Sequence, residues 1–215
     1  METNELDCNL LNLFSRTILV KKIKNNCLTI LEAEEDGKLE VSFTNGRFTR
    51  FSENKLGKMN ISDFFNPEGK EIIGKICDGI FLVYLEDRII LCLVELKKNI
   101  NNKFKRAVQQ IEGSYIKIAM LLSLMCNIKD IELAVFIGGQ LDEIVDDPDI
   151  DYLKKDADFT EGENPESKLK DFSLHGKVFM NFPFFLEQTI HENYRKKNIP
   201  VIHLEAGAAF NMQTL

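Results

Sequence analysis

The sequence predicts an α/β protein with a central mixed β-sheet flanked by helices. Two consecutive apolar runs, 76–85 and 88–97, are rich in Ile, Leu and Val on both faces. This pattern is typical of central strands that are covered on both sides. A stripe of apolar residues at helical spacing follows over 102–126, and a further apolar run occupies 131–137. Strands separated by a helix of this length indicate the α/β class.

The residues before this core predict an N-terminal helix and a hairpin. Apolar positions at helical spacing indicate a helix over 4–24, and 27–32 is a short strand. Residues 39–44 and 47–51 alternate in polarity around Asn45-Gly46, a pair that suits a tight turn between two strands of a hairpin. Residues 53–70 are polar and rich in turn formers.

The residues after the core predict an acidic loop insertion followed by a helix and a strand. The run 131–137 ends at Gly138-Gly139, and residues 142–166 interrupt the apolar pattern. A helix is expected near 184–197 and a short strand over 200–204. We therefore expect one domain over 1–215. Its parts are an N-terminal embellishment over 1–70, a core over about 70–140, the acidic loop 142–166 and a C-terminal helix and strand within 175–205.

The charge of the chain is concentrated in the acidic loop. Residues 142–166 contain eleven acidic residues and two lysines, a formal charge of −9, whereas the whole chain carries −7. The rest of the chain is therefore left with +2. The overall acidity does not exclude a polyanionic partner, because one segment accounts for all of it.

The composition predicts a cytoplasmic protein. The five cysteines form no Cys-x-x-Cys pair, and Cys77 and Cys92 lie inside apolar runs, which indicates a reducing compartment. No run of about 18 apolar residues is present, so we expect no membrane span. The N-terminus begins with acidic residues and lacks the basic start of a signal peptide.

Asp78, Glu95 and Lys97 meet at one end of the apolar hairpin 76–97 if its loop is centred between Glu86 and Asp87. In that register Asp78 lies opposite Glu95, with the Cβ atoms about 5 Å apart. Lys97 stands two residues beyond Glu95 and shares its face of the sheet. Leu96 points to the other face, but its carbonyl remains near the cluster. A loop of odd length would instead turn Asp78 away from Glu95.

Two carboxylates held this close repel each other unless a cation neutralises them. Mg²⁺ prefers oxygen ligands and is commonly bound by one or two carboxylates together with a substrate phosphate. Such an ion can activate water and polarise a phosphoryl oxygen. The alternative is a plain salt-bridge cluster at the strand end, in which Lys97 neutralises both carboxylates.

Asp78, sixteen further residues and then Glu95-Leu96-Lys97 resemble the D…E-x-K signature of the PD-(D/E)XK nuclease superfamily. The resemblance covers roughly 70–140, and the order strand, turn, strand, helix, strand matches the restriction-endonuclease-like core. It implies that Asp78 and Glu95 bind a catalytic Mg²⁺, with Mn²⁺ as a substitute. It also implies that Leu96 adds its backbone carbonyl and that Lys97 acts on the attacking water.

A basic segment follows the signature. Five bases fall within ten residues that contain no acid, namely Lys97, Lys98, Lys103, Lys105 and Arg106. Beside the site we expect them to contact phosphates, although such a segment alone is also typical of a solvated helix start. Some branches of the superfamily carry Gln-x-x-x-Tyr on this helix, which implies a nucleic-acid contact for Gln110. Tyr115 stands one position too far along and is expected in the core.

Two functions from different classes remain open. The first is a Mg²⁺-dependent nuclease that hydrolyses phosphodiester bonds, with DNA as the expected nucleic acid. The second is a catalytically silent module that binds nucleic acid or protein on the same fold. A homodimer is compatible with the first, because many nucleases cut duplexes as dimers.

Overall fold

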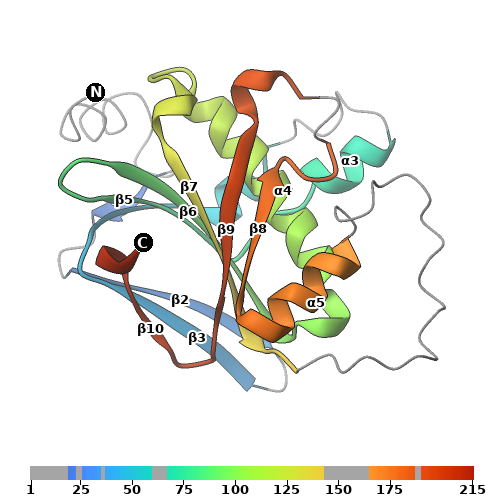
Figure 1. Cartoon of the computed structure of the whole chain (residues 1–215). Helices are drawn as coiled ribbons and strands as arrows, with labels where there is room; N and C mark the ends of the chain where they lie inside the picture. Colours follow the sequence, from blue (N-terminus) through green and yellow to red (C-terminus); the bar gives the residue numbers. More distant parts are fainter. Residues whose placement is uncertain (1–18, 23–25, 35–36, 60–66, 143–164, 187–189) are drawn as a thin grey trace.

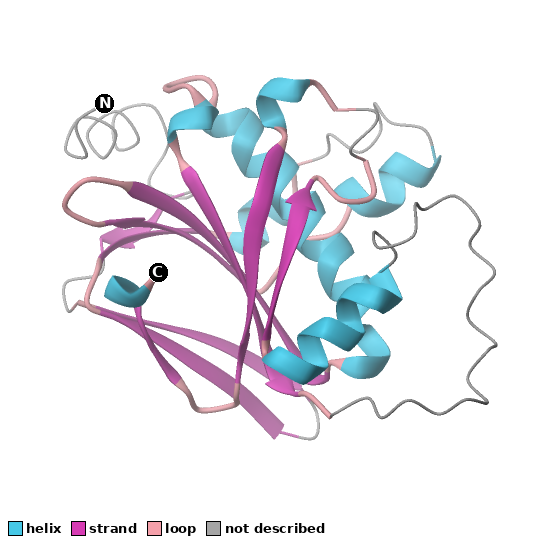
Figure 2. Cartoon of the chain, viewed as in Figure 1, coloured by secondary structure: helices cyan, strands magenta, loops and turns pink. Residues whose placement is uncertain are grey.

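The protein is a mixed α/β molecule built around a large seven-stranded sheet and a small three-stranded sheet. The computed structural model describes residues 19–22, 26–34, 37–59, 67–142, 165–186 and 190–215 (Figure 1). The α-helices gather on one side of the large sheet, and the small sheet lies on the other (Figure 2). The predicted α/β class and mixed central sheet are therefore confirmed. Helices flank the large sheet on one face, and strands of the small sheet cover the other face.

The large sheet combines antiparallel and parallel strands. Its central strands β6, β7 and β9 run parallel to one another, and the other neighbouring strands are antiparallel. In spatial order its strands are β1 (Leu19–Lys22), β4 (Arg47–Phe51), β5 (Gly79–Tyr84), β6 (Ile89–Asn99), β7 (Glu132–Gln140), β9 (Lys196–Leu204) and β8 (Lys177–Phe182).

The hairpin β5–β6 has the register that the sequence predicts. Gly79 pairs with Val94, and Tyr84 pairs with Ile89, so the loop is centred between Glu86 and Asp87. All six residues of β5 and the first nine of β6 are buried. Such burial on both faces explains the near-continuous apolar runs of these strands.

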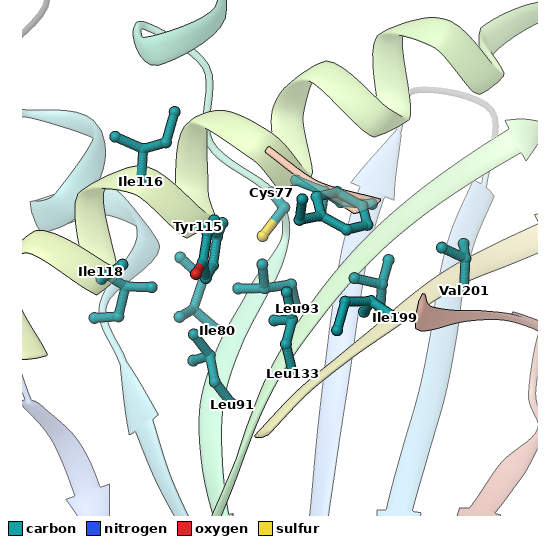
Figure 3. Packing of buried hydrophobic residues seen from close by; sticks show 14 of the residues in the cluster. Cys77, Ile80, Leu91, Leu93, Tyr115, Ile116, Ile118, Leu133, Ile199 and Val201 are labelled. Atoms are coloured by element: carbon teal, nitrogen blue, oxygen red, sulfur yellow. The ribbon is translucent and has the colours of Figure 1, made fainter. Parts of the chain in front are cut away.

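The helical layer is dominated by α4 (Phe104–Leu122), which follows a 3₁₀ turn at Asn101–Lys103. Its apolar stripe, which includes Tyr115 and Ile118, packs on the large sheet. Figure 3 shows these two side chains close to Ile80 and Leu91 of the sheet. Tyr115 is fully buried, so its expected place in the core is confirmed.

Three shorter helices complete this layer. The helix α5 joins it through Phe172, whose ring centroid lies 5.4 Å from that of Phe104. The sequence pattern predicts none of the three, because each is too short to show a clear helical period. They are α2 (Glu53–Gly57), α3 (Pro67–Ile73) and α5 (Pro165–His175).

The small sheet covers the other face of the large one with a second apolar core. Phe43 lies at its centre, with ring centroids 4.9 Å from both Phe81 and Phe136. Phe210 packs on Phe136 at 5.0 Å, so the C-terminal strand takes part in this core. The small sheet is ordered β10 (Ala209–Asn211), β3 (Gly37–Thr44) and β2 (Cys27–Glu34).

The predicted hairpin around Asn45-Gly46 is wrong, although both of its strands exist. β3 pairs with β2 and β10, whereas β4 pairs with β1 and β5, so the chain changes sheets at this point. Asn45 has the positive φ of +60° that a turn here requires. The pair Asn-Gly reports the local backbone conformation, but it does not report which strands pair.

Other expectations near the ends of the chain also need correction. Within the predicted helix 4–24, residues 1–18 lie outside the described residues, and Leu19–Lys22 forms β1. In the described part of 184–197 there is only a 3₁₀ turn at Glu192–Tyr194, and β9 begins at Lys196. The predicted strand 200–204 forms the second half of β9. Most of the acidic loop, 143–164, lies outside the described residues.

Candidate active site

The hairpin register brings Asp78 and Glu95 together. Asp78 directly precedes β5, and one step beyond the pair Gly79–Val94 places it opposite Glu95. Ile80, Leu82, Leu91 and Leu93 face α4, and the alternation along each strand puts the two carboxylates on that same face. Asp78 is also tied to β6, because its Oδ2 accepts a hydrogen bond of 2.7 Å from the backbone N–H of Leu96.

Lys97 completes the cluster from the same face. Its Nζ donates to Oε1 of Glu95 and to the backbone carbonyl of Leu96, the latter at 3.0 Å. Glu95 is 0% exposed and Lys97 is 6% exposed. The second carboxylate oxygen of Glu95, Oε2, is buried and has no hydrogen-bond partner among the described residues. The site therefore holds a buried ion pair with one carboxylate oxygen to spare.

The electrostatics of the cluster show an excess of negative charge. Burial, together with the charge of Asp78, raises the pKa of Glu95 well above its ordinary value, although Lys97 acts in the opposite direction. Burial lowers the pKa of Lys97, but the charges of Glu95, Asp78 and Glu32 outweigh it and raise that pKa overall. Three carboxylates and one ammonium give a formal charge of −2. The contributions of Asp78 and Glu32 to both pKa values reflect this excess of negative charge.

Glu32 is the member of this cluster that the sequence pattern did not single out. It lies on β2 in the small sheet, and its charge acts on both Glu95 and Lys97. The residue falls inside the predicted strand 27–32, but no sequence spacing links that strand to the hairpin 76–97. Only the packing of one sheet against the other brings it near the site.

The backbone around Lys97 is shaped by a bulge and a glycine. The register between β6 and β7 shifts between Lys97 and Asn99, and Lys97 pairs with Gly139. Gly139 has φ +134°, and a Cβ atom there would overlap the backbone carbonyl of Lys97. Its own carbonyl lies 2.8 Å from Nε2 of His203 on β9. Bulges of this kind are common beside functional sites, where they re-aim a side chain.

The segment before Asp78 is held by α4. The backbone carbonyl of Ile76 accepts a hydrogen bond of 3.1 Å from Nε2 of Gln110, and the N–H of Cys77 donates to Oγ of Ser114 at 2.7 Å. Gln110, which we expected to contact nucleic acid, is half-buried and makes this bond to the protein. Ser114 is fully buried, although it belongs to a stripe of polar residues at helical spacing, namely Lys103, Arg106, Gln110, Ser114 and Lys117. The reason is that α3 packs against this face of α4.

The basic side chains lie on the surface beside the site. Lys98 follows Lys97 at the bulge and is exposed, as are Lys103, Lys105 and Arg106 around the start of α4. The adjacent loop is fixed as well, because Asn101 exchanges two hydrogen bonds with the backbone of Asp142 at 2.8 and 2.9 Å. The described end of the acidic segment is thus attached next to the basic residues.

The arrangement limits how a metal ion could be held. Within the described ranges, no three His, Cys, Asp or Glu side chains come close enough to hold an ion by themselves. Asp78, Glu95 and the carbonyl of Leu96 are the groups that could contribute.

No helix in the described part of the chain is long and apolar enough to cross a membrane.

Comparison with known proteins adds no relative. The chain matches no protein-family model, no curated protein and no solved structure.

Proposed function

We propose that this protein is a metal-dependent nuclease that hydrolyses phosphodiester bonds of nucleic acid, with DNA as the substrate. One observation carries the proposal. In the register of β5–β6, Asp78 lies opposite Glu95, and the Nζ of Lys97 donates to the Leu96 carbonyl. These are the groups that the D…E-x-K signature requires, and they meet where the strands end.

The order of the surrounding elements supports a restriction-endonuclease-like core. β5 and β6 form an antiparallel hairpin, α4 follows, and β7 returns parallel to β6. This order of strands and helix is the one that the resemblance implies for 70–140. The small sheet and the strands β1, β4, β8 and β9 of the large sheet lie outside this stretch of the chain.

The residues of the site fit a divalent ion such as Mg²⁺, with Mn²⁺ as a substitute. The buried Oε2 of Glu95 lacks a hydrogen-bond partner among the described residues, and the cluster has a formal excess of negative charge. Asp78, Glu95 and the Leu96 carbonyl would hold the ion, and water and substrate phosphate would supply its other ligands. When bound, the ion supplies Lewis acidity and a more acidic water.

The remaining groups position the substrate. Lys97 is directed into the cluster by Glu95 and Leu96, where its ammonium can orient a water or stabilise developing negative charge. The exposed Lys98, Lys103, Lys105 and Arg106 offer phosphate contacts beside it. Gln110 supports the site from behind, through the backbone of Ile76.

A second candidate is a catalytically silent module that binds nucleic acid or protein on this fold. The closed pair between Lys97 and Glu95 favours it, because an ion pair with good contacts needs no metal. Both candidates share the basic surface at the start of α4, so binding alone does not separate them. Cleavage does.

The test is a cleavage assay on supercoiled, linear and single-stranded DNA with Mg²⁺, Mn²⁺ or EDTA. The wild type should cut in the presence of either ion, and EDTA should abolish cleavage. Glu95→Gln should lose activity, whereas Glu132→Gln, the same change at an exposed residue at the opposite end of the sheet, should retain it. Binding without cleavage under all conditions would support the silent module instead.

A further inference from the structure

The ammonium of Lys97 lies between two of the groups that the proposed function assigns to a metal ion. Its Nζ hydrogen-bonds to Oε1 of Glu95 and, at 3.0 Å, to the carbonyl oxygen of Leu96. A cation that bound the Leu96 carbonyl and either carboxylate oxygen of Glu95 would have to lie at the position of this ammonium or directly beside it. The two positive charges therefore exclude each other at this position.

Burial makes this exclusion strong. Glu95 is fully buried and Lys97 is 6% exposed, so little water is present to separate an ammonium from a divalent ion. Charges interact more strongly in such surroundings than they do in water. The lysine also has a flexible four-carbon stem, which allows its head group to leave one partner for another.

We propose that Lys97 is a built-in counter-ion that fills the divalent-metal position of the metal-free protein and must leave Glu95 when a metal binds. The proposal rests on the proposed nuclease function, of which it describes the regulation. It predicts that the affinity for metal rises when the charge of Lys97 is removed. A lysine that only orients water would leave metal affinity nearly unchanged when it is removed, whereas removal of a competing counter-ion raises that affinity.

The affinity for Mn²⁺, measured in the absence of nucleic acid, tests whether removal of Lys97 strengthens metal binding. Isothermal titration calorimetry is done with the wild type, Lys97→Met, Glu95→Gln and Lys98→Met. Methionine keeps much of the length of lysine and removes its charge. Lys98→Met is the matched control, because it removes the same charge one residue away from an exposed side chain.

We expect Lys97→Met to bind Mn²⁺ at least about tenfold more tightly than the wild type. Lys98→Met should stay within about twofold of the wild type, and Glu95→Gln should abolish binding. Equal or weaker binding by Lys97→Met, with wild-type binding that depends on Glu95, would overturn the counter-ion role and leave the proposed function standing. Absence of Mn²⁺ binding in all four proteins would overturn both.

A second measurement uses only the wild type, because Lys97→Met leaves the buried Glu95 without its cation and can fail to fold. Lysine side chains labelled with ¹³C at Cε are followed by NMR during a titration with diamagnetic Mg²⁺. The Cε signal of Lys97 should shift along the binding curve, while that of Lys129, exposed at the opposite end of the sheet, stays in place. An unchanged Lys97 signal at saturating Mg²⁺ would overturn the proposal.

Discussion

Glu95 and Glu112 are both fully buried carboxylates, but they are stabilised in different ways. Glu95 has the ammonium of Lys97, whereas Glu112 accepts three backbone hydrogen bonds, from Phe184, Phe185 and Leu186, at 2.7 to 2.8 Å. The latter bonds attach the segment after β8 to the middle of α4. Burial raises the pKa of Glu112 to about 7, although these three bonds lower it. Glu112 therefore titrates within the range in which the protein can be studied.

At the residue scale we expect a pH dependence of stability that comes from Glu112. Its pKa is raised from 4.5 to about 7 in the folded state. The stabilisation from the protonated form is therefore complete below pH 4.5 and is lost as the pH rises to 7. This loss is on the order of 3 kcal/mol in the free energy of unfolding.

Urea unfolding of the wild type and of Glu112→Gln at several pH values between 4.5 and 8 measures this contribution. At pH 4.5 the variant should be less stable than the wild type, because an amide has only one acceptor oxygen for three N–H groups. The difference in unfolding free energy between the two proteins should shrink as the pH rises to 7. Parallel pH profiles would show that Glu112 is ionised throughout.

At the element scale, the strands β6 and β7 and the helix α4 between them determine the geometry of the site. Much of this unit could be predicted, because the apolar runs and the helical stripe have clear periods. The even loop at Glu86-Asp87 also predicted the facing of Asp78 and Glu95, which the register confirms. The contribution of Glu32 could not be predicted, because it depends on how the small sheet packs on the large one.

Prediction failed where local conformation does not determine pairing. The turn at Asn45-Gly46 exists, but Phe48 of β4 pairs with Val83 of β5 and not with a residue of β3. The polar stripe of α4 is a similar case, because polar residues at helical spacing are typical of a solvent-facing side. Lys117 of the polar stripe is buried, and at Gly113, one turn earlier, the backbone of α3 approaches closely at Ile72. Neither the pairing of β4 with β5 nor the packing of α3 on α4 can be predicted from the apolar periodicity of a single segment.

A glycine substitution tests the importance of the β6–β7 contact. Gly139→Ala should destabilise the protein strongly, because the new Cβ overlaps the carbonyl of Lys97. Gly207→Ala is the matched control, since Gly207 also has a positive φ, +80°, but has nothing within 4 Å of an added Cβ. The control carries only the backbone strain of about 1–2 kcal/mol.

We expect the free energy of unfolding of Gly139→Ala to fall by a further ~1–3 kcal/mol, the usual range for overpacking. Urea unfolding of both variants measures the difference. Under the proposed function, the folded fraction of Gly139→Ala should also cut DNA more slowly than Gly207→Ala, because the bulge that aims Lys97 is displaced. Equal stability of the two variants would mean that the backbone of β6 at Lys97 moves away from the added Cβ atom at little energetic cost.

At the scale of the whole molecule, positive and negative charge are separated along the chain. Residues 142–166 carry −9, and the exposed bases around the start of α4 lie beside Asp142, where that segment begins. We predict from charge alone that the segment competes with nucleic acid for those bases. Most of it, 143–164, lies outside the described residues, and the competition stays a prediction.

The salt dependence of DNA binding measures the contribution of the basic surface. A triple variant, Lys103→Ala, Lys105→Ala and Arg106→Ala, should bind more weakly and with a smaller dependence on salt. The slope of log K against log salt should fall by about 0.9 for each phosphate contact that is lost. The control triple Lys55→Ala, Lys58→Ala and Lys129→Ala removes the same charge from exposed sites elsewhere. Equal slopes for the two triples would place the DNA on another surface.

The parallel pairing of β10 with β3 has a consequence for the order in which the protein assembles during synthesis. Ser42 pairs with Ala209, and Phe210 covers the aromatic rings of the second core. β10 follows every other described strand, so a growing chain can form the hairpin β5–β6 and its catalytic candidates early. The side of the second core beside Phe43 and Phe136 therefore lacks the cover of Phe210 until β10 leaves the ribosome. Contacts of such long range are slow to form, and an exposed apolar face invites association in the meantime. Nascent chains that stop before Ala209 should therefore depend on chaperones, even though their candidate site is already assembled.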